Sequence, residues 1–343
     1  MNFRISDRKP VFIVAEVSAN HNQDFKIAAA LIKKSKECGA DAVKFQVYTP
    51  DTLTINADNR YFRIKHPQWG GQTLYELYKK AYTPWRWMGR LKRIADDLGI
   101  IFFATVFDKT SVDFLEGLRV PAYKIASFEL VDLSLIEYAA KTKKALIMST
   151  GMASLPEVKD AVSAAKNGGA KQVILLKCVS SYPARPDEMN LKTILHMKKL
   201  FGCPVGLSDH SLGTDVSVAA AVLGARVIEK HFTLSRKIKT PDSFFSIEPA
   251  EFKDLVARIR TVENALGEVR YGSTADEKKN KVFRRSLIVV RSIKKGEPLT
   301  NENVNSIRPG YGLPPKNLKL VLGKKAAQDV PEGTPLRLDM IRM

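Results

Sequence analysis

The stretch PVGLSDHSLGTDVSVAAAVLGARVIEKHF (204–232) decides the expected fold. It contains two short apolar segments with an Ala/Val-rich segment of helical length between them, which predicts a strand, a helix and a second strand. Each strand ends on a histidine, His210 in the first and His231 in the second. Because parallel strands end at the same edge of a sheet, we predict that the two imidazoles bind one metal ion. The alternative is that each histidine only forms hydrogen bonds within its own loop.

The same unit recurs along the chain from the N-terminus. Segments that are apolar throughout alternate with amphipathic helical segments, which predicts parallel strands buried on both faces. Eight such strands within one domain predict a closed (β/α)8 barrel, a TIM barrel, rather than an open sheet. The expected strands are 11–17, 42–48, 100–107, 122–127, 145–150, 172–179, 204–210 and 226–232, and the expected helices include 25–38, 84–98, 156–167, 190–201, 214–223 and 250–266.

The chain is expected to contain a second, smaller domain. A polar linker at 273–281 follows the predicted barrel domain, 1–272. Within the remaining residues, 282–343, the segments IKKGEPLTNENV (293–304) and VPEGTPLRLDMI (330–341) repeat one frame of apolar, glycine and Pro-Leu positions. This repeat and the Gly/Pro-rich turns predict a compact β-rich domain that is too small to hold a catalytic pocket alone.

Composition limits the class of protein. The 343 residues are 45% hydrophobic and 27% charged, as in globular proteins, and no apolar stretch approaches the roughly 20 residues of a membrane span. We therefore expect a cytoplasmic protein with no membrane partner. The three cysteines, Cys38, Cys178 and Cys203, form no CxxC pair, so neither a structural zinc site nor a disulfide framework is indicated.

The formal net charge of +19 raises the alternative of nucleic-acid binding. The basic residues are spread over amphipathic helices, however, with one cluster at EKKNKVFRR (277–285), and no nucleic-acid-binding motif accompanies them. We expect solvated basic faces that steer small anionic substrates, and no nucleic-acid partner.

Polar residues stand in or directly after the last residues of the expected strands. In a barrel these positions converge on one mouth, where active sites are built. A polar residue in an otherwise apolar strand costs stability unless it is paired, so the whole ring predicts an active site, although any single member is equally consistent with a polar strand cap. The ring comprises Glu16, Lys44, Gln46, Thr105, Lys124, Ser127, Glu129, Ser149, Ser180, Ser208, His210 and His231.

The residue types in this ring indicate a chemistry. Lys44 and Lys124, together with several hydroxyls, suit a small substrate that carries a phosphate and a carboxylate. A divalent ion on the histidine pair would polarise a carbonyl, and Glu16 is placed to act as acid or base. The expected reaction joins a phosphorylated anion to an aldehyde. The chemical alternative is a Schiff-base aldolase that uses Lys124 or Lys230, which would not need the histidines. The insertion 51–83 is expected to form a lid or a substrate wall over the mouth, and 233–248 a second polar loop directly after the last strand.

A set of motifs in chain order resembles the sialic acid synthase family, whose members fuse a (β/α)8 barrel to an antifreeze-like (SAF) domain. The resemblance covers essentially the whole chain. It implies condensation of phosphoenolpyruvate with an open-chain N-acetylated amino sugar, release of phosphate through C–O cleavage, and a need for Mn2+ or another divalent ion such as Mg2+ or Co2+. The motifs are AEVSANHNQD (15–24), KFQ (44–46), PAYKIASFEL (121–130), STGM (149–152), LSDHS (207–211), EKHFT (229–233) and RPG (308–310).

The resemblance also implies roles for individual residues. His210 and His231 would bind the metal ion, and Glu16 would act as acid or base. Arg308 would come from the partner subunit of a domain-swapped homodimer. VSSYP (179–183) departs from the family's TNIYP-like pattern, which leaves the role of Ser180 in phosphate binding open. Phosphoenolpyruvate would be held by Lys44, Thr105, Lys124, Ser127, Ser149 and Ser208, and the sugar by Gln46, Phe107, Glu129, Tyr182, Asp242 and Phe283.

Two segments, 70–85 and 241–252, are similar to the pseudaminic acid synthase branch of that family. Its acceptor is 2,4-diacetamido-2,4,6-trideoxy-altrose, and Phe244 and Phe245 beside Asp242 suit the methyl group at C6 of such a sugar. The alternatives are N-acetylmannosamine and a legionaminic-type acceptor. A non-enzymatic alternative is a carbohydrate-binding or nucleic-acid-binding protein with an inactive barrel.

Overall fold

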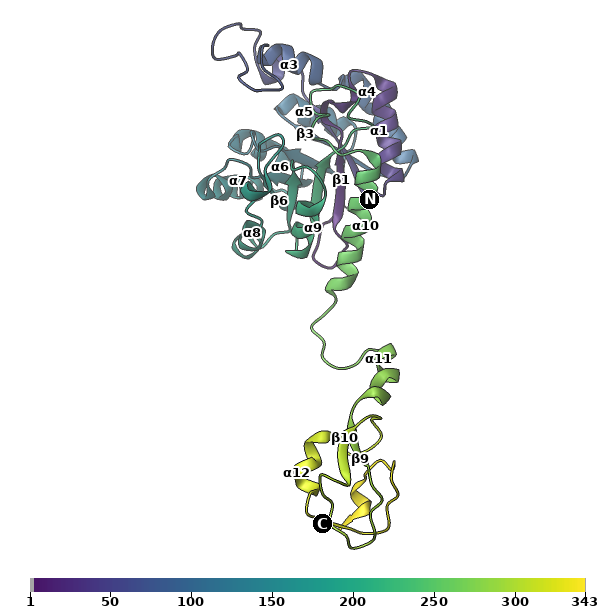
Figure 1. Cartoon of the computed structure of the whole chain (residues 1–343). Helices are drawn as coiled ribbons and strands as arrows, with labels where there is room; N and C mark the ends of the chain where they lie inside the picture. Colours follow the sequence, from purple (N-terminus) through teal and green to yellow (C-terminus); the bar gives the residue numbers. More distant parts are fainter. Residues whose placement is uncertain (1–2, 343) are drawn as a thin grey trace. The chain divides into compact units, whose positions relative to one another are not determined.

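The computed structural model describes residues 3–342. The chain divides into two compact units, Met1–Gly267 and Glu268–Met343. The first is a closed barrel of eight parallel strands in the order β1 to β8, which confirms the predicted fold (Figure 1). The strands are β1 (Phe12–Glu16), β2 (Ala42–Val47), β3 (Ile101–Val106), β4 (Ala122–Ile125), β5 (Ala145–Ser149), β6 (Gln172–Cys178), β7 (Val205–Asp209) and β8 (Val227–His231).

Each strand of the barrel is followed by at least one helix. Several helices begin at a side chain that accepts hydrogen bonds from free backbone N–H groups, as Asp24, Asp108 and Ser154 do. The helices are α1 (Phe25–Glu37), α2 (Pro50–Leu53), α3 (Leu74–Ala81), α4 (Trp85–Asp97), α5 (Lys109–Gly117), α6 (Leu133–Lys141), α7 (Leu155–Asn167), α8 (Thr193–Phe201), α9 (Asp215–Val222) and α10 (Pro249–Leu266).

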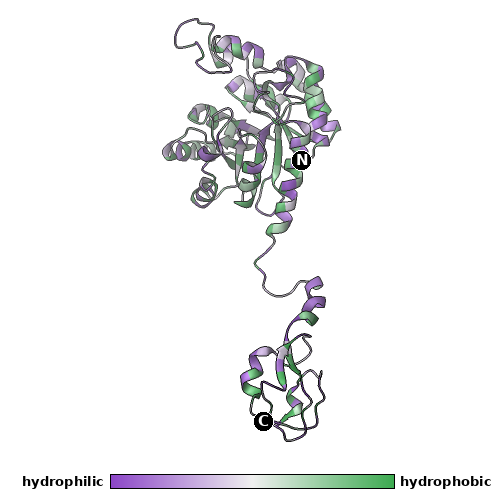
Figure 2. Ribbon diagram, viewed as in Figure 1, coloured by the Kyte–Doolittle hydropathy of each residue, from purple (hydrophilic) through white to green (hydrophobic). Residues whose placement is uncertain are grey.

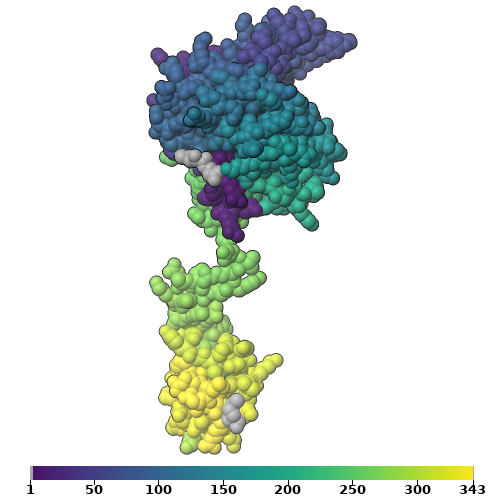
Figure 3. Space-filling model, turned by 180° about the vertical axis from the view of Figure 1, so that it is seen from behind, coloured from purple at the N-terminus to yellow at the C-terminus, as the bar shows by residue number. Residues whose placement is uncertain are grey.

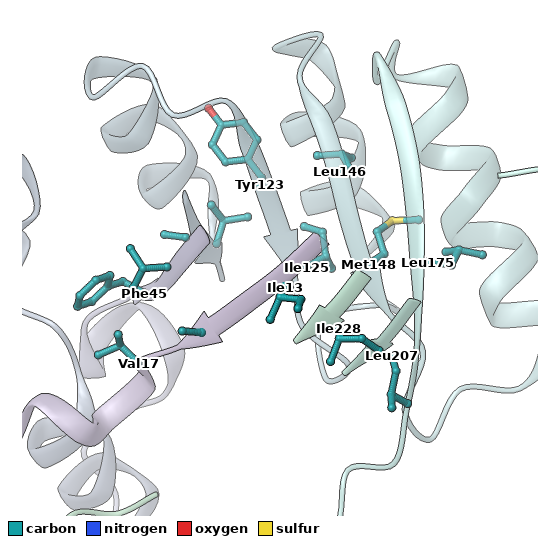
Figure 4. Packing of buried hydrophobic residues seen from close by; sticks show 14 of the residues in the cluster. Ile13, Val17, Phe45, Tyr123, Ile125, Leu146, Met148, Leu175, Leu207 and Ile228 are labelled. Atoms are coloured by element: carbon teal, nitrogen blue, oxygen red, sulfur yellow. The ribbon is translucent and has the colours of Figure 1, made fainter. Parts of the chain in front are cut away.

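Alternation along each strand separates two buried layers. Residues of one parity, such as Ile13, Ile125 and Leu207, belong to the cluster between the strands and the helices, part of which Figure 4 shows. Residues of the other parity form a second cluster that includes Val14 and Phe103. On the face of this second cluster, the side chain two positions further along the strand is polar instead of apolar. The interior of the barrel is therefore apolar at the start of the strands and charged at their ends.

The C-terminal unit is a small β-rich domain. Its elements are α11 (Ala275–Lys279), η3 (Asn280–Phe283), β9 (Ser286–Val289), β10 (Val304–Ile307), η4 (Pro315–Asn317), α12 (Leu318–Val321), β11 (Lys325–Ala326), η5 (Leu338–Met340) and β12 (Ile341–Arg342). The two copies of the sequence repeat pair with each other, because Ile293 and Val330 exchange backbone hydrogen bonds of 2.9 and 2.8 Å. Part of the segment expected as a linker, 273–281, is helical, since Thr274 and Glu277 cap α11 reciprocally.

Hydrophobic and hydrophilic residues are distributed differently over the strands and helices of the barrel. Hydrophobic residues concentrate in the strands, and hydrophilic residues lie along the outer helices (Figure 2). The start of the described chain, purple in Figure 3, is visible on the surface beside the green residues of α10. Glu263 on α10 accepts a hydrogen bond from the N–H of the buried Val11. Among the helices of residues 3–342, none is long and apolar enough to cross a membrane.

Candidate active site

Four charged side chains meet inside the barrel at the C-terminal ends of the strands. Lys44 Nζ on β2 lies 3.2 Å from Glu16 Oε2 on β1 and 3.3 Å from Glu229 Oε1 on β8. Lys124 Nζ on β4 lies 3.5 Å from the same oxygen of Glu229. All four residues are buried. Two lysines and two carboxylates thus compensate one another where water has been excluded, which is the condition for keeping buried charges.

Hydroxyl and amide groups complete this network. Gln46 donates to Glu16 Oε1 at 2.9 Å, and Ser127 Oγ accepts the Gly151 N–H at 3.1 Å. The remaining contacts are Lys44 Nζ to Thr105 Oγ1 at 3.1 Å, Lys124 Nζ to Ser149 Oγ at 2.6 Å, and Ser208 Oγ to Glu229 Oε1 at 3.0 Å. The residues expected to hold phosphoenolpyruvate therefore lie around one charged centre. Small hydroxyls beside lysines suit the oxygens of a phosphate or a carboxylate.

The two carboxylates have opposite electrostatic environments. Burial raises the pKa of Glu16 to about 7, against the attraction of Lys44, and the neighbouring Glu229 carboxylate adds to the rise. Burial alone would also raise the pKa of Glu229, but Lys124, Lys44 and the Ser208 hydroxyl lower it to about 2. Glu229 is a permanent anion that balances the lysines, whereas Glu16 can exchange a proton near neutral pH.

The predicted histidine pair is assembled. The rings of His210 and His231 lie with their centroids 5.3 Å apart. His210 Nδ1 lies 2.8 Å from the Val179 carbonyl oxygen, which can only accept, so Nδ1 carries a hydrogen and Nε2 is the nitrogen that can bind a metal ion when the ring is neutral. Burial, with His210 and nearby lysines, holds the pKa of His231 well below its usual value. Burial opposes the charged form of His210 as well, but Cys178 and the Val179 carbonyl raise its pKa. His231 is thus available as a neutral imidazole, and the hydrogen bond to Val179 fixes the orientation of the His210 ring.

The pair fits a metal ion with positions open to substrate. Within residues 3–342, His231 Nδ1 and Glu229 Oε2 are buried without a hydrogen-bond partner, and such unsatisfied atoms favour an unseen ligand. Asp242 Oδ2 lies 3.9 Å from His231 Nδ1, too far for a hydrogen bond. No group of three or more His, Cys, Asp or Glu side chains in the described part of the chain is arranged to hold a metal ion. Two imidazoles thus leave further ligands to water or substrate.

An aromatic wall lines one side of the histidine pair. Tyr182 lies with its ring centroid 4.3 Å from His210, and Phe245 lies 4.7 Å from His231. Trp69 comes from the insertion 51–83 and contacts Tyr182 and Phe244 at 5.5 and 6.1 Å. Its indole N–H donates to the Pro241 carbonyl at 2.7 Å, which ties this insertion to the loop 233–248. Both insertions therefore contribute to the wall beside the histidines.

Other predicted residues lie near this centre with less direct contacts. Asp242 accepts the Ala19 N–H at 3.2 Å, and Phe107 packs edge-on against Tyr48 with ring centroids 5.0 Å apart. Burial raises the pKa of Glu129 to about 7. Ser180 is half-buried, and its hydroxyl lies 4.0 Å from Cys178 Sγ.

Two predicted sugar-site residues belong to the C-terminal unit. Phe283 ends η3 and is 61% exposed, and Arg308 is an exposed residue that follows β10. They therefore belong to a different unit from the barrel residues of the site.

Three features of the centre were not among the predicted site residues. Glu229 bridges both lysines. The alternation of side chains along β8 could have predicted it, since Glu229 lies on the same interior face of the strand as His231. Cys178 Sγ lies 3.8 Å from His210 Nδ1. Lys230, considered as a nucleophile, is instead bound to Asp209 Oδ2 at 2.8 Å and to the Ser211 carbonyl at 2.7 Å. Its parity differs from that of Glu229, and its role is structural.

Comparisons with known proteins agree with this geometry. Residues 31–271 match the NeuB family, and residues 284–342 match the SAF domain. The chain is 45% identical over 329 residues to the pseudaminic acid synthase of Campylobacter jejuni, covering 96% of each chain. It is 37% identical to the N,N'-diacetyllegionaminic acid synthase of Legionella pneumophila, covering 95% and 93% of the two chains. The crystal structure of N-acetylneuraminic acid synthetase from Leptospira borgpetersenii has a TM-score of 0.72 at 33% identity, covering 81% of this chain and 93% of that one.

Proposed function

The chain belongs to the NeuB family and is a phosphoenolpyruvate-dependent nonulosonic acid synthase, and we propose that its acceptor is 2,4-diacetamido-2,4,6-trideoxy-altrose, so that it makes pseudaminic acid. The sequence identity to pseudaminic acid synthases is the main support for this acceptor. The aromatic wall beside the histidines supports it, because Phe244 and Trp69 are only partly buried and offer apolar surface to a deoxy sugar with a methyl group at C6.

The charged centre suits phosphoenolpyruvate. In this proposal Lys44 and Lys124 bind its phosphate and carboxylate, and the hydroxyls of Thr105 and Ser149 orient the oxygens. The reaction joins C3 of phosphoenolpyruvate to the aldehyde carbon, adds the oxygen of water at C2, and releases phosphate by breaking the C2–O bond. Glu16 takes the proton from that water, because its raised pKa lets it act as a base near neutral pH.

A divalent ion, Mn2+ or a similar metal, would be held by His210 and His231. When bound, it supplies a Lewis acid for the aldehyde oxygen of the acceptor. The protein's own part is to fix the orientation of the His210 ring through its hydrogen bond to the Val179 carbonyl, and to keep His231 neutral by burial.

The C-terminal unit is assigned a role in a dimer. We place Arg308, and with it Phe283, at the sugar end of a partner subunit's barrel in a domain-swapped homodimer, which is supported by their exposure on a domain without a catalytic centre of its own. The three free thiols agree with a cytoplasmic location. Mixing an Arg308→Ala chain with an inactive Lys124→Ala chain would restore one good site per mixed dimer. No recovery of activity on mixing would contradict the exchange.

The acceptor is tested by phosphate release from phosphoenolpyruvate with Mn2+ in the presence of each sugar. We expect turnover with 2,4-diacetamido-2,4,6-trideoxy-altrose and little with N-acetylmannosamine or the legionaminic-type acceptor. Phe244→Ala should raise KM for the preferred sugar about tenfold or more, because an apolar contact of about 1–3 kcal/mol is lost, and should leave KM for phosphoenolpyruvate unchanged. Turnover with N-acetylmannosamine alone would overturn the proposed acceptor but not the reaction class.

A further inference from the structure

A cavity of about 680 Å³ lies at the opposite end of the barrel from the active site. Its walls include the first residues of strands, Phe12 of β1, Ile101 of β3 and Ala145 of β5, together with Pro121 just before β4. The catalytic side chains come from the other ends of these strands. The cavity is therefore separate from the charged centre that binds the substrates, and none of the site residues described above lines it.

The walls of this cavity carry an excess of positive charge. Asp96 is the one acidic residue in the lining, and it is already paired with Lys92 at 2.6 Å. Lys144 pairs with Glu116. The basic residues of the lining are Arg4, Lys9, Lys92, Arg119, Lys143, Lys144 and Lys171. With every residue from 3 to 342 considered, the side chains of Arg4, Lys9, Arg119 and Lys143 have no ion pair or hydrogen bond. Like charges gathered without counterions favour an anionic ligand.

Two of these cations stand where the chain elsewhere uses glycine. After α1, α4, α7 and α9, the residue that follows the C-cap is a glycine with positive φ: Gly39, Gly99, Gly169 and Gly224. After α5 and α6 the corresponding residues are Arg119, with φ of 55°, and Lys143, with φ of 57°. This left-handed conformation is unfavourable for a residue with a Cβ atom.

A cation near a helix C-terminus is favoured by the helix dipole, but all six helices have that dipole. What distinguishes Arg119 and Lys143 is that both side chains lie on the cavity. Retaining two basic residues in a strained conformation beside one cavity is consistent with a ligand that needs their charge.

The uncharged part of the lining restricts the kind of anion. Phe3 and Phe12 pack edge to face on the wall with ring centroids 5.4 Å apart, and Ile101 lies beside them. A volume of about 680 Å³ lies within the usual range for small-molecule sites. We propose that this cavity binds a mononucleotide, with its phosphate on Arg119, Lys143 and Arg4 and its base against Phe3 and Phe12. Guanidinium groups bind phosphate oxygens in pairs, and aromatic rings accept the flat face or edge of a base.

The test is isothermal titration calorimetry on the full-length protein with AMP, GMP, CMP and UMP, and with inorganic phosphate and the four nucleosides for comparison. We expect at least one mononucleotide to bind about tenfold or more tightly than either phosphate or its nucleoside, because charge and ring contribute together. Saturating phosphoenolpyruvate should leave this binding intact, since it occupies the other end of the barrel. Displacement by phosphoenolpyruvate, or binding of phosphate as tightly as of the nucleotide, would overturn the proposal.

The cavity variant is Arg119→Asn/Lys143→Asn, because asparagine tolerates the left-handed conformation and the fold should be kept. It should weaken mononucleotide binding about tenfold or more while leaving synthase activity measurable. Lys33→Gln/Lys159→Gln is the matched control, since it removes the same charge from exposed faces of α1 and α7 outside the cavity. Equal weakening in both variants, or absence of mononucleotide binding in the unmodified protein, would show that the cavity is not a nucleotide site.

Discussion

Glu229 on β8 forms an ion pair with Lys124 on β4, directly across the barrel, with 3.5 Å between carboxylate oxygen and ammonium nitrogen. The same oxygen is 3.3 Å from Lys44. One anion thus holds both of the lysines to which we assign phosphoenolpyruvate. Without substrate, Glu229 compensates the buried ammonium group of Lys124 and shares the compensation of Lys44 with Glu16.

The change Glu229→Gln should leave Lys124 without its carboxylate partner and Lys44 with Glu16 alone. We expect a loss of about 3–5 kcal/mol in the free energy of unfolding, because one partner of a buried ion pair has been removed. Phosphoenolpyruvate should then raise the melting temperature more than it does in the unmodified protein, since the substrate replaces the lost charge. Thermal unfolding with and without phosphoenolpyruvate measures both effects. Glu37→Gln, which removes a 60% exposed partner of Lys34, is the control and should cost less than about 1 kcal/mol.

His231→Ala should abolish turnover and lower metal content, because one of two proposed protein ligands is lost. Metal content after dialysis is measured by elemental analysis, and the fold by circular dichroism. His196→Ala, on the exposed face of α8, should change neither quantity. Full activity with bound metal in His231→Ala would remove the histidine pair as the metal site.

The pH dependence of kcat/KM tests Glu16. If Glu16 must be deprotonated to accept a proton from water, activity should fall as pH decreases through about 7, which is the raised pKa of this group. Glu16→Gln should reduce the rate by about 10²–10⁴-fold and remove this limb, so that the residual rate is flat between pH 6 and 8. An acid limb with the same midpoint in Glu16→Gln would assign the titration to another group.

Glu129 predicts a pH dependence of stability. Burial raises its pKa from 4.5 to about 7, so the folded state holds a proton that the unfolded state releases. This contribution to stability is present below about pH 4.5 and is lost as pH rises through about 7. Urea unfolding at pH 5 and pH 8 should therefore show a smaller difference for Glu129→Gln than for the unmodified protein. Glu137→Gln, an exposed change on α6, is the control, and an equal effect from it would contradict the assignment.

Much of the barrel follows from local sequence. Apolar segments of strand length between amphipathic helices predicted all eight strands, because a parallel strand buried on both faces needs apolar side chains of both parities. Polar residues at strand ends predicted the mouth for the same reason: Lys44, Lys124 and His231 break patterns that are otherwise apolar.

Tertiary structure alone decided which polar residues contact one another. The pairing of Glu229 with Lys124 depends on barrel closure, which brings β4 and β8 to face each other across the interior. No local sequence pattern predicts the distance between these two side chains. Likewise, Trp69 reaches Tyr182 and the Pro241 carbonyl only because two insertions far apart in the chain fold over the same mouth. Residue type and periodicity thus determined where the charges of this protein lie along each strand, whereas packing in three dimensions determined which charges compensate one another.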